Sequence, residues 1–258
     1  MSSTVHISVG EVAATLVLVA IAAAVSLWRR AELEADLGLA VLRSFLQLTA
    51  VGYVIQAIFD SDSLWLVAAL LGVMVAFGTV TANRRARGVP GALVPIALAL
   101  TAAAVVTLGL VLALGVFGAK PRFLVPVGGM VIGNSMTSAA VALNRLADEV
   151  TGQARLIEAT LALGATARQA SAGLVTRSLR SGLIPLIDST KTTGIVFFPG
   201  TMVGMLVAGA APVDAVRLQL VLLWSLLGSV ALAALVAVSL GYRGFFTPAH
   251  QLREPPPP

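Results

Sequence analysis

The sequence predicts an all-α, polytopic integral membrane protein whose chain crosses the bilayer about seven times. Of its 258 residues, 58% are hydrophobic and only 11% are charged, and its mean hydropathy is +0.95. Soluble domains have about 45–50% apolar and about 25% charged residues. The apolar residues also gather in stretches close to the roughly 20 residues that a spanning helix needs. Together these observations exclude a soluble enzyme, a disordered chain and a water-facing repeat protein.

Seven apolar stretches define the predicted spans. They are Val12–Trp28, Leu37–Phe59, Leu64–Ala82, Val94–Phe117, Phe123–Leu143, Leu183–Gly209 and Leu218–Leu240. Each has a length within or close to the range of a tilted helix. The first is expected to be retained, because Met1–Glu11 lacks the basic residues of a signal peptide. The sixth is the least regular, since Asp188 and Lys191 lie in its first half, and we expect it to kink or break at Pro199.

Basic residues gather on one side of these spans. That side carries 12 arginines: Arg29, Arg30, Arg84, Arg85, Arg87, Arg145, Arg155, Arg168, Arg177, Arg180, Arg243 and Arg253. The other side carries only Lys120, Arg122 and Arg217. Because Lys and Arg are enriched in cytoplasmic loops, we expect a protein of the cell (inner) membrane with its N-terminus outside and its C-terminus in the cytoplasm. The net charge of +5 therefore does not point to nucleic acid.

The longest predicted connection is the 39-residue stretch from Asn144 to Gly182, which we expect to be a cytoplasmic loop. A segment of that size in a compact chain usually has a function. We assign residues 1–252 to a single transmembrane domain. Residues 253–258 contain five residues after Arg253, four of them proline, and are expected to form a disordered tail.

The sequence offers little for catalysis or for binding a cofactor. The absence of cysteine excludes disulfides, zinc–thiolate sites and thiol chemistry. His6 and His250 lie at opposite ends of the chain, and neither HExxH nor GxSxG occurs. Lys191-Thr192 lacks the glycines of a Walker A loop, because Pro185 and Thr190 stand in their places. We therefore predict a non-enzymatic chain without a cofactor or a tight metal site.

One motif stands out in the long connection. The run Glu-Ala-Thr-Leu-Ala-Leu-Gly over 158–164 resembles the EAA…G loop of ABC-transporter permeases, with Thr replacing the second Ala. Small residues let a short helix lie close in a cleft of a partner ATPase, and glycine lets the chain turn out again. We expect the glutamate to lie in the first turn, where it suits the helix N-terminus. An amphipathic surface helix is the alternative interpretation.

The resemblance implies that a separate ATPase subunit docks on a coupling helix over Leu156–Gln169. The candidate docking residues are Glu158, Ala159, Thr160, Gly164 and Arg168. A further contact over Arg84–Arg87 is possible by the same comparison.

Further blocks make the resemblance to one family specific. They are Arg43–Leu48 followed by Gly52–Val54, Gly129–Met136, Phe198–Gly204, and Phe245–Thr247 followed by His250–Leu252. In this order they resemble the FetB family, the permease subunits of Fet-type iron-export ABC transporters, whose plant relatives are linked to aluminium tolerance. The resemblance implies a homodimeric permease that hydrolyses no ATP itself, pairs with a separate ATPase, and exports iron, another metal or a small solute.

Polar and methionine side chains inside the spans are the candidates for a translocation pathway. They are Arg43, Gln47, Met130, Asn134, Met136, Asp188, Lys191, Met202 and Met205. A lone Arg near the bilayer centre costs about 2.5–3.5 kcal/mol on insertion scales, so we expect Arg43 to face the bundle unless it snorkels to the headgroups. Asp188 and Lys191 can pair on one helix face. Met is mostly a flexible core filler, so metal ligation is not predicted.

Two GxxxG pairs, Gly129…Gly133 and Gly200…Gly204, predict close helix packing. A self-sufficient secondary transporter or channel is the alternative function. It would need inverted repeats and intramembrane carboxylates for proton coupling, and the sequence shows neither convincingly.

Overall fold

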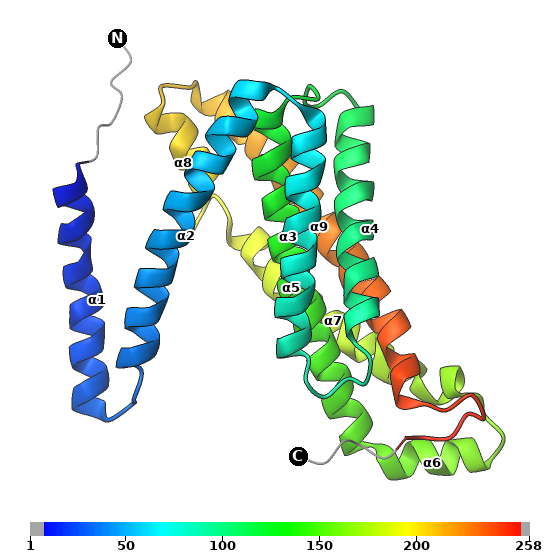
Figure 1. Cartoon of the computed structure of the whole chain (residues 1–258). Helices are drawn as coiled ribbons and strands as arrows, with labels where there is room; N and C mark the ends of the chain where they lie inside the picture. The colour runs from blue at the N-terminus through cyan, green and yellow to red at the C-terminus, as the bar shows by residue number, and fades with distance from the viewer. Residues whose placement is uncertain (1–7, 254–258) are drawn as a thin grey trace.

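The computed structural model describes residues 8–253, and over this range the chain forms helices without a named strand (Figure 1). The helices are α1 (Val9–Arg29), α2 (Glu34–Ser61), α3 (Leu64–Arg85), α4 (Leu93–Ala113), α5 (Pro121–Gly152), α6 (Ala154–Ala162), α7 (Ala167–Thr192), α8 (Gly200–Val207), α9 (Pro212–Gly241) and the 3-10 helix η1 (Tyr242–Phe245). Of the tail predicted over 253–258, only Arg253 lies within the described residues.

Within residues 8–253, six helices are long and apolar enough to cross a membrane: α1, α2, α3, α4, α5 and α9 continued by η1. This confirms the prediction of an all-α polytopic membrane protein. Six of the predicted spans correspond to these helices in order. The fourth ends at Ala113, four residues before the predicted Phe117, because Gly115 with φ +66 begins a turn there.

The sixth predicted span, Leu183–Gly209, is not one helix. Its first part is the C-terminal portion of α7, and its last part is the short α8. The irregular segment between them starts at Thr193, and Gly194 within it has the left-handed φ of +86. Pro199 is the N-cap residue of α8 and so starts a helix, rather than bending one. The predicted break is confirmed, but it begins six residues before Pro199.

The stretch Asn144–Gly182, predicted to be a cytoplasmic loop that contains a coupling helix, is almost entirely helical. α5 continues through Gly152, α6 follows, and α7 begins at Ala167, so only Gln153 and residues 163–166 are not helical. The charges in this stretch lower its average hydropathy, yet the apolar face of α5 continues with Leu146 and Val150, both buried. α5 is therefore amphipathic and continues as a helix past the end of its predicted span, although the composition of this stretch favours a loop.

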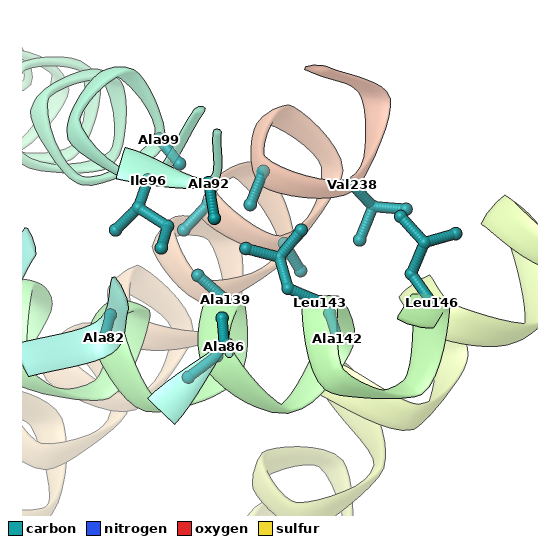
Figure 2. Close-up of a cluster of buried hydrophobic side chains, with 14 of the residues drawn as sticks. Ala82, Ala86, Ala92, Ile96, Ala99, Ala139, Ala142, Leu143, Leu146 and Val238 are labelled. Atoms are coloured by element: carbon teal, nitrogen blue, oxygen red, sulfur yellow. The ribbon is translucent and has the colours of Figure 1, made fainter. Parts of the chain in front are cut away.

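The core lies among α3, α4, α5, α7 and α9 (Figure 1), which we call the body. Figure 2 shows its centre, where Leu143 and Leu146 of α5 lie toward Ile96 of α4 and Val238 of α9. Many of the surrounding buried residues are alanines: Ala82, Ala86, Ala92, Ala99, Ala139 and Ala142. Small side chains let helix backbones approach closely, which is the main source of attraction between helices in lipid.

The closest helix contacts occur at other glycines than the predicted pairs. A Cβ added at Gly182 of α7 would lie 2.8 Å from Ala142 Cβ and 3.0 Å from the Ser138 carbonyl oxygen of α5. No heavy atom lies within 4 Å of such an atom at Gly133, Gly200 or Gly204. Within this chain, helices therefore do not pack closely at those three positions, and close packing there stays a prediction for a contact with a second copy.

The hairpin of α1 and α2 diverges from the body toward one end of the molecule (Figure 1). Ile58 is the buried residue of α2, and it packs with Val67 of α3 and Val125 of α5 near the opposite end. The groove between α1 and α2 has a volume of about 700 Å³ and an almost wholly apolar lining.

The two ends of the molecule differ in charge. α1, α3, α5 and α9 all run toward one end, where α6 lies across the bundle (Figure 1). The 12 arginines predicted to be cytoplasmic belong to the ends of these helices, to α6, to α7 and to the segment after α9. We call this the basic end. Lys120, Arg122 and Arg217 lie at the starts of α5 and α9, at the opposite end.

Candidate functional site

α6 is a short helix at the basic end, set between the two longer helices α5 and α7. Its inner side is apolar: Ile157 is buried, and Leu161 packs against the core. Gln153, with φ −117 and ψ 19, breaks the helical path after α5 and lets α6 change direction. The inner side therefore attaches α6 to the body and leaves its outer side open.

The outer side of α6 carries two large apolar side chains. Leu156 is 63% exposed and Leu163, the C-cap residue, is 90% exposed. Arg155, Glu158 and Ala159 are exposed beside them. We call these five residues the α6 surface. Leucines this exposed, flanked by charges beyond the spanning part of the bundle, are typical of a surface that another protein covers.

The predicted docking residues have mixed outcomes. Glu158, Ala159 and Gly164 are exposed, whereas Thr160 is half-buried and its hydroxyl donates to the Leu156 carbonyl at 2.7 Å. Gly164 ends the helix as expected, with φ +90. α6 starts at Ala154, so Glu158 lies in its second turn and the first-turn prediction is wrong.

The predicted coupling helix Leu156–Gln169 is two elements. α6 stops at Ala162, and Arg168 belongs to the first turn of α7, where it is exposed. Thr166 and Gln169 form a capping box that starts α7 there. The sequence alone did not single out Leu156 and Leu163 as docking residues. They lie seven residues apart, about two helical turns, which places both on one side of the α6 segment.

A buried carboxylate joins α5 to α7 directly before α6. Glu149 is 7% exposed, and its Oε2 accepts from Arg177 Nε of α7 at 2.8 Å and from Gln153 Nε2 at 2.6 Å. Its Oε1 accepts from Arg145 Nη2, one turn earlier on α5. The sequence shows the i,i+4 spacing of Arg145 and Glu149, but only the fold brings Arg177 to them. We call these four residues the Glu149 junction.

A cavity of about 190 Å³ lies between α5, α7 and α9. Its lining consists of Asn134, Thr137, Ser138, Val141, Gly182, Pro185, Leu186, Ser189 and Val230. Asn134 Nδ2 donates to the Met130 carbonyl at 2.8 Å, and the Ser138 hydroxyl donates to the Gly182 carbonyl of α7 at 2.8 Å. The cavity lining is therefore neutral and mostly apolar, with hydroxyl and amide groups from Asn134, Thr137 and Ser189.

The structure brings some of the predicted pathway residues together and leaves others apart. Asn134 lines the cavity, and Asp188 and Lys191 form the predicted pair, 3.4 Å apart, on the turn of α7 that carries Ser189. Both members of the pair are largely exposed, at 63% and 70%. Arg43 and Gln47 are exposed on α2 and do not face the body of this chain, so their pathway role stays a prediction.

The four methionines differ in their surroundings. Met130 and Met136 are half-buried and pack against the core, as core fillers do. Met202 and Met205 are half-buried on α8. Among residues 8–253, no group of three or more His, Asp or Glu residues is placed to hold a metal ion.

Comparison with known sequences gives a consistent result over nearly the whole chain. Residues 9–246 match the uncharacterised protein family UPF0014. The chain is 42% identical over 244 residues, 94% of its length, to the rice (Oryza sativa subsp. japonica) UPF0014 membrane protein STAR2, of which 85% is covered. It is 39% identical over 242 residues, 93% of its length, to Protein ALUMINUM SENSITIVE 3 of Arabidopsis thaliana, of which 88% is covered.

A bacterial protein is similar over the same range. The chain is 35% identical over 243 residues to the probable iron export permease protein FetB of Escherichia coli, with 94% of this chain and 93% of that protein covered. No solved structure matches the chain.

Proposed function

We propose that this chain, which belongs to the UPF0014 family, is the membrane-spanning subunit of an ATP-driven ABC transporter and is powered by a separate ATPase subunit. The similarity to a named permease and the six candidate spans support a transport role in a membrane. In this proposal ATP hydrolysis takes place in the partner chain, and the chain described here forms the pathway.

The α6 surface is the observation that carries the proposal. α5 has 32 residues, which at 1.5 Å per residue is about 48 Å, longer than the roughly 30 Å of the hydrocarbon layer. α6 therefore lies beyond the lipid, where leucines as exposed as Leu156 and Leu163 meet water unless a protein covers them. Arg155 and Glu158 flank them with both signs of charge, as at the rim of a protein interface.

A second copy of the chain would complete the pathway. Asn134 and Thr137 are exposed in the middle of α5, and Asp188 and Lys191 are exposed near the end of α7. Polar and charged side chains at this depth are costly against lipid and usually face a protein or a water-filled cavity. We therefore assign this face of α5 and α7 to the interior of a homodimer, with the 190 Å³ cavity on its path.

The basic end supports the proposed orientation. Its 12 arginines, against three basic residues at the other end, favour a cytoplasmic location under the positive-inside rule. The first helix then starts outside the cell membrane, the chain ends inside, and the α6 surface faces a cytoplasmic ATPase.

Iron, another metal ion or a small solute is the proposed cargo, and export is the proposed direction. The name of the bacterial relative supports iron export. Fe²⁺ is held tightly by carboxylate and imidazole ligands, whereas Asn134, Thr137 and Ser189 line the cavity with neutral oxygens. An ion would therefore pass weakly held, with its water or a chelator still bound.

Co-purification with a candidate ATPase subunit of the same organism tests the docking step. Leu163→Ser should lower recovery of the ATPase about tenfold, which corresponds to a loss of about 1.4 kcal/mol of binding if Leu163 is a central anchor of the interface. Glu158→Lys should lower it as well. Leu114→Ser is the matched control, since Leu114 is 68% exposed at the opposite end of the molecule. Full recovery with Leu163→Ser would contradict the docking assignment.

Transport by the reconstituted pair tests the energy source. Iron movement should require ATP and both chains. Movement of equal rate on an ion gradient, without the ATPase, would instead establish a secondary transporter or channel.

A further inference from the structure

The segment after α9 folds back on itself to form a closed loop at the basic end. We call residues 242–253 the C-terminal clasp. Thr247 N donates to the Gln251 carbonyl at 2.8 Å, and Arg253 N donates to the Phe245 carbonyl at 2.8 Å. Phe246 and Leu252 form an antiparallel bridge, and the Arg253 guanidinium donates to the Phe246 carbonyl at 3.2 Å. These bonds give the clasp one defined shape.

The clasp is firmly attached to the body. Phe245 and Phe246 are buried, at 6% and 5% exposed, and belong to the main core. Gly244 lies so close to the α3–α4 connection that an added Cβ would overlap the Pro90 carbonyl oxygen at 2.2 Å. We therefore expect α9, the α3–α4 connection and the clasp to move together.

The clasp also meets α6 at its first residue. A small cavity of about 60 Å³ is lined by Leu252 and Arg253 of the clasp, by Ala154 of α6, and by Gly88, Pro90, Val150, Thr151 and Phe245. Ala154 thus shares a packed boundary with the clasp as well as with α5.

At the other end of α6, His250 contacts the start of α7. The Ala167 N–H, five residues beyond the end of α6, donates to His250 Nδ1 at 3.3 Å. This N–H is one of the first-turn donors that have no partner within a helix. His250 has φ +58, a conformation in which a side chain is less favourable than glycine, so its imidazole contact offsets a local cost.

From these contacts we infer that the clasp is a second mechanical connection of α6, with His250 as its positioning residue. Chain connectivity and the packed inner side, with Ile157 and Leu161, join α6 to the body. The clasp adds a connection from α9 and the α3–α4 connection to the first residue of α6 and to the start of α7, on the two sides of the α6 segment. A displacement of α6 would therefore move α9 with it, and the clasp and α6 would move as one body. The coupling role of the clasp rests on the proposed function, whereas its contacts with α6 and α7 do not depend on that proposal.

Hydrogen exchange of the full chain in nanodiscs tests the geometry without any ATPase. His250→Phe keeps an aromatic ring and removes the acceptor, so exchange of the Ala167 amide should rise about two- to tenfold, the loss expected for one net hydrogen bond. His250→Asn supplies a carbonyl acceptor and should restore protection. Unchanged exchange in His250→Phe, or no rescue by Asn, would overturn the positioning role.

ATPase stimulation in the assembled pair tests the coupling. His250→Phe should leave co-purification intact and lower stimulation of the ATPase, and His250→Asn should recover it. If the parent chain gives no stimulation, the proposed function fails, while the exchange experiment still decides the role of His250. Full stimulation with His250→Phe would overturn the clasp as a coupling connection.

Cross-linking tests the shared movement directly, since the chain has no cysteine of its own. The variant Ala154→Cys with Leu252→Cys, joined by a short bifunctional thiol reagent, should retain ATPase stimulation, because its two sites move together. The reagent-treated single variants are the controls. Stimulation lost only on cross-linking would show that α6 moves against the clasp and would overturn the inference.

Discussion

The α1–α2 hairpin and the body are both strongly apolar, yet they are packed very differently. In the apolar, membrane-spanning stretch of α9, 50% of the residues are buried, compared with 6% in the stretch of α1 and none in the stretch of α2. α1 is also rich in alanine, and Ala13, Ala20 and Ala23 line the apolar groove beside α2. Small apolar residues therefore permit close packing without ensuring it.

The contrast shows which region is covered by contacts within the chain and which region leaves its surface open. The body closes on itself through glycine contacts, the Glu149 junction and the clasp. The hairpin touches the body near Ile58 and leaves its other surfaces to lipid or, in the proposed homodimer, to a second copy. Matched substitutions in the two regions can test this difference.

Gly182→Leu should have the largest effect, because its side chain would overlap Ala142 and the Ser138 carbonyl. We expect a loss of about 3 kcal/mol of stability, the upper part of the range for overpacking, seen as a lower melting temperature in detergent. Gly38→Leu in the hairpin is the control, since no atom lies within 4 Å there. Equal losses in the two variants would remove the distinction between the regions.

Glu149→Gln should come next. It replaces a buried carboxylate that holds Arg145, Arg177 and Gln153, and bonds to charged groups contribute about 1.5–3 kcal/mol. We expect a loss of about 2 kcal/mol in the same thermal measurement. Asp188→Asn, in an exposed pair, should change stability by less than about 0.5 kcal/mol. A larger effect of Asp188→Asn would indicate that its pair is covered in the assembly.

Ser138→Ala should have a smaller effect, of about 1 kcal/mol, because it removes the buried bond from α5 to the Gly182 carbonyl of α7. Ser44→Ala in α2 is its counterpart, since the Ser44 hydroxyl donates to Val41 of its own helix at an exposed position. Its stability should remain within about 0.3 kcal/mol of the parent. A neutral Ser138→Ala would mean that the α5–α7 crossing depends on packing alone.

Gly52→Ala should have the smallest effect and the opposite sign. An added Cβ meets no atom within 4 Å, so alanine should stabilise α2 by about 0.5 kcal/mol through helix propensity. Thermal unfolding in nanodiscs checks the sign. A clear destabilisation would reveal a close contact with a second copy and sharpen the account of the hairpin.

Much of the fold was predictable because hydropathy directly reports contact with lipid. The starts and ends of α1, α2 and α3 agree with the predicted spans to within about four residues. Hydropathy did not show how far α5 and α7 extend into residues 144–182, because charges on one side of these helices conceal a continuing apolar side. The break before Pro199 was expected, but its extent depends on the turn at Gly194, which a local pattern does not fix.

The candidate site was predictable only where its residues are consecutive. The motif over 158–164 indicated α6 and its glycine turn. Arg177, the α7 partner of Glu149, lies 28 residues away along the chain, and Ala167, the partner of His250, lies 83 residues away. Only helix packing reveals these two contacts. The spacing of Leu156 and Leu163 is visible in the sequence. An apolar residue on a polar segment indicates a contact surface only when its exposed fraction is known.

The unequal lengths of α5 and α7 have a consequence for the space between them. α5 is an unbroken rod from the opposite end of the molecule to α6, whereas α7 stops at Thr192 and is followed by irregular chain. In the proposed transporter, a force applied through α6 would be carried along α5 as a whole, whereas the non-helical segment 193–199 separates α7 from α8. Movement of α7 relative to α5 would then change the width of the cavity that Asn134 and Ser189 line.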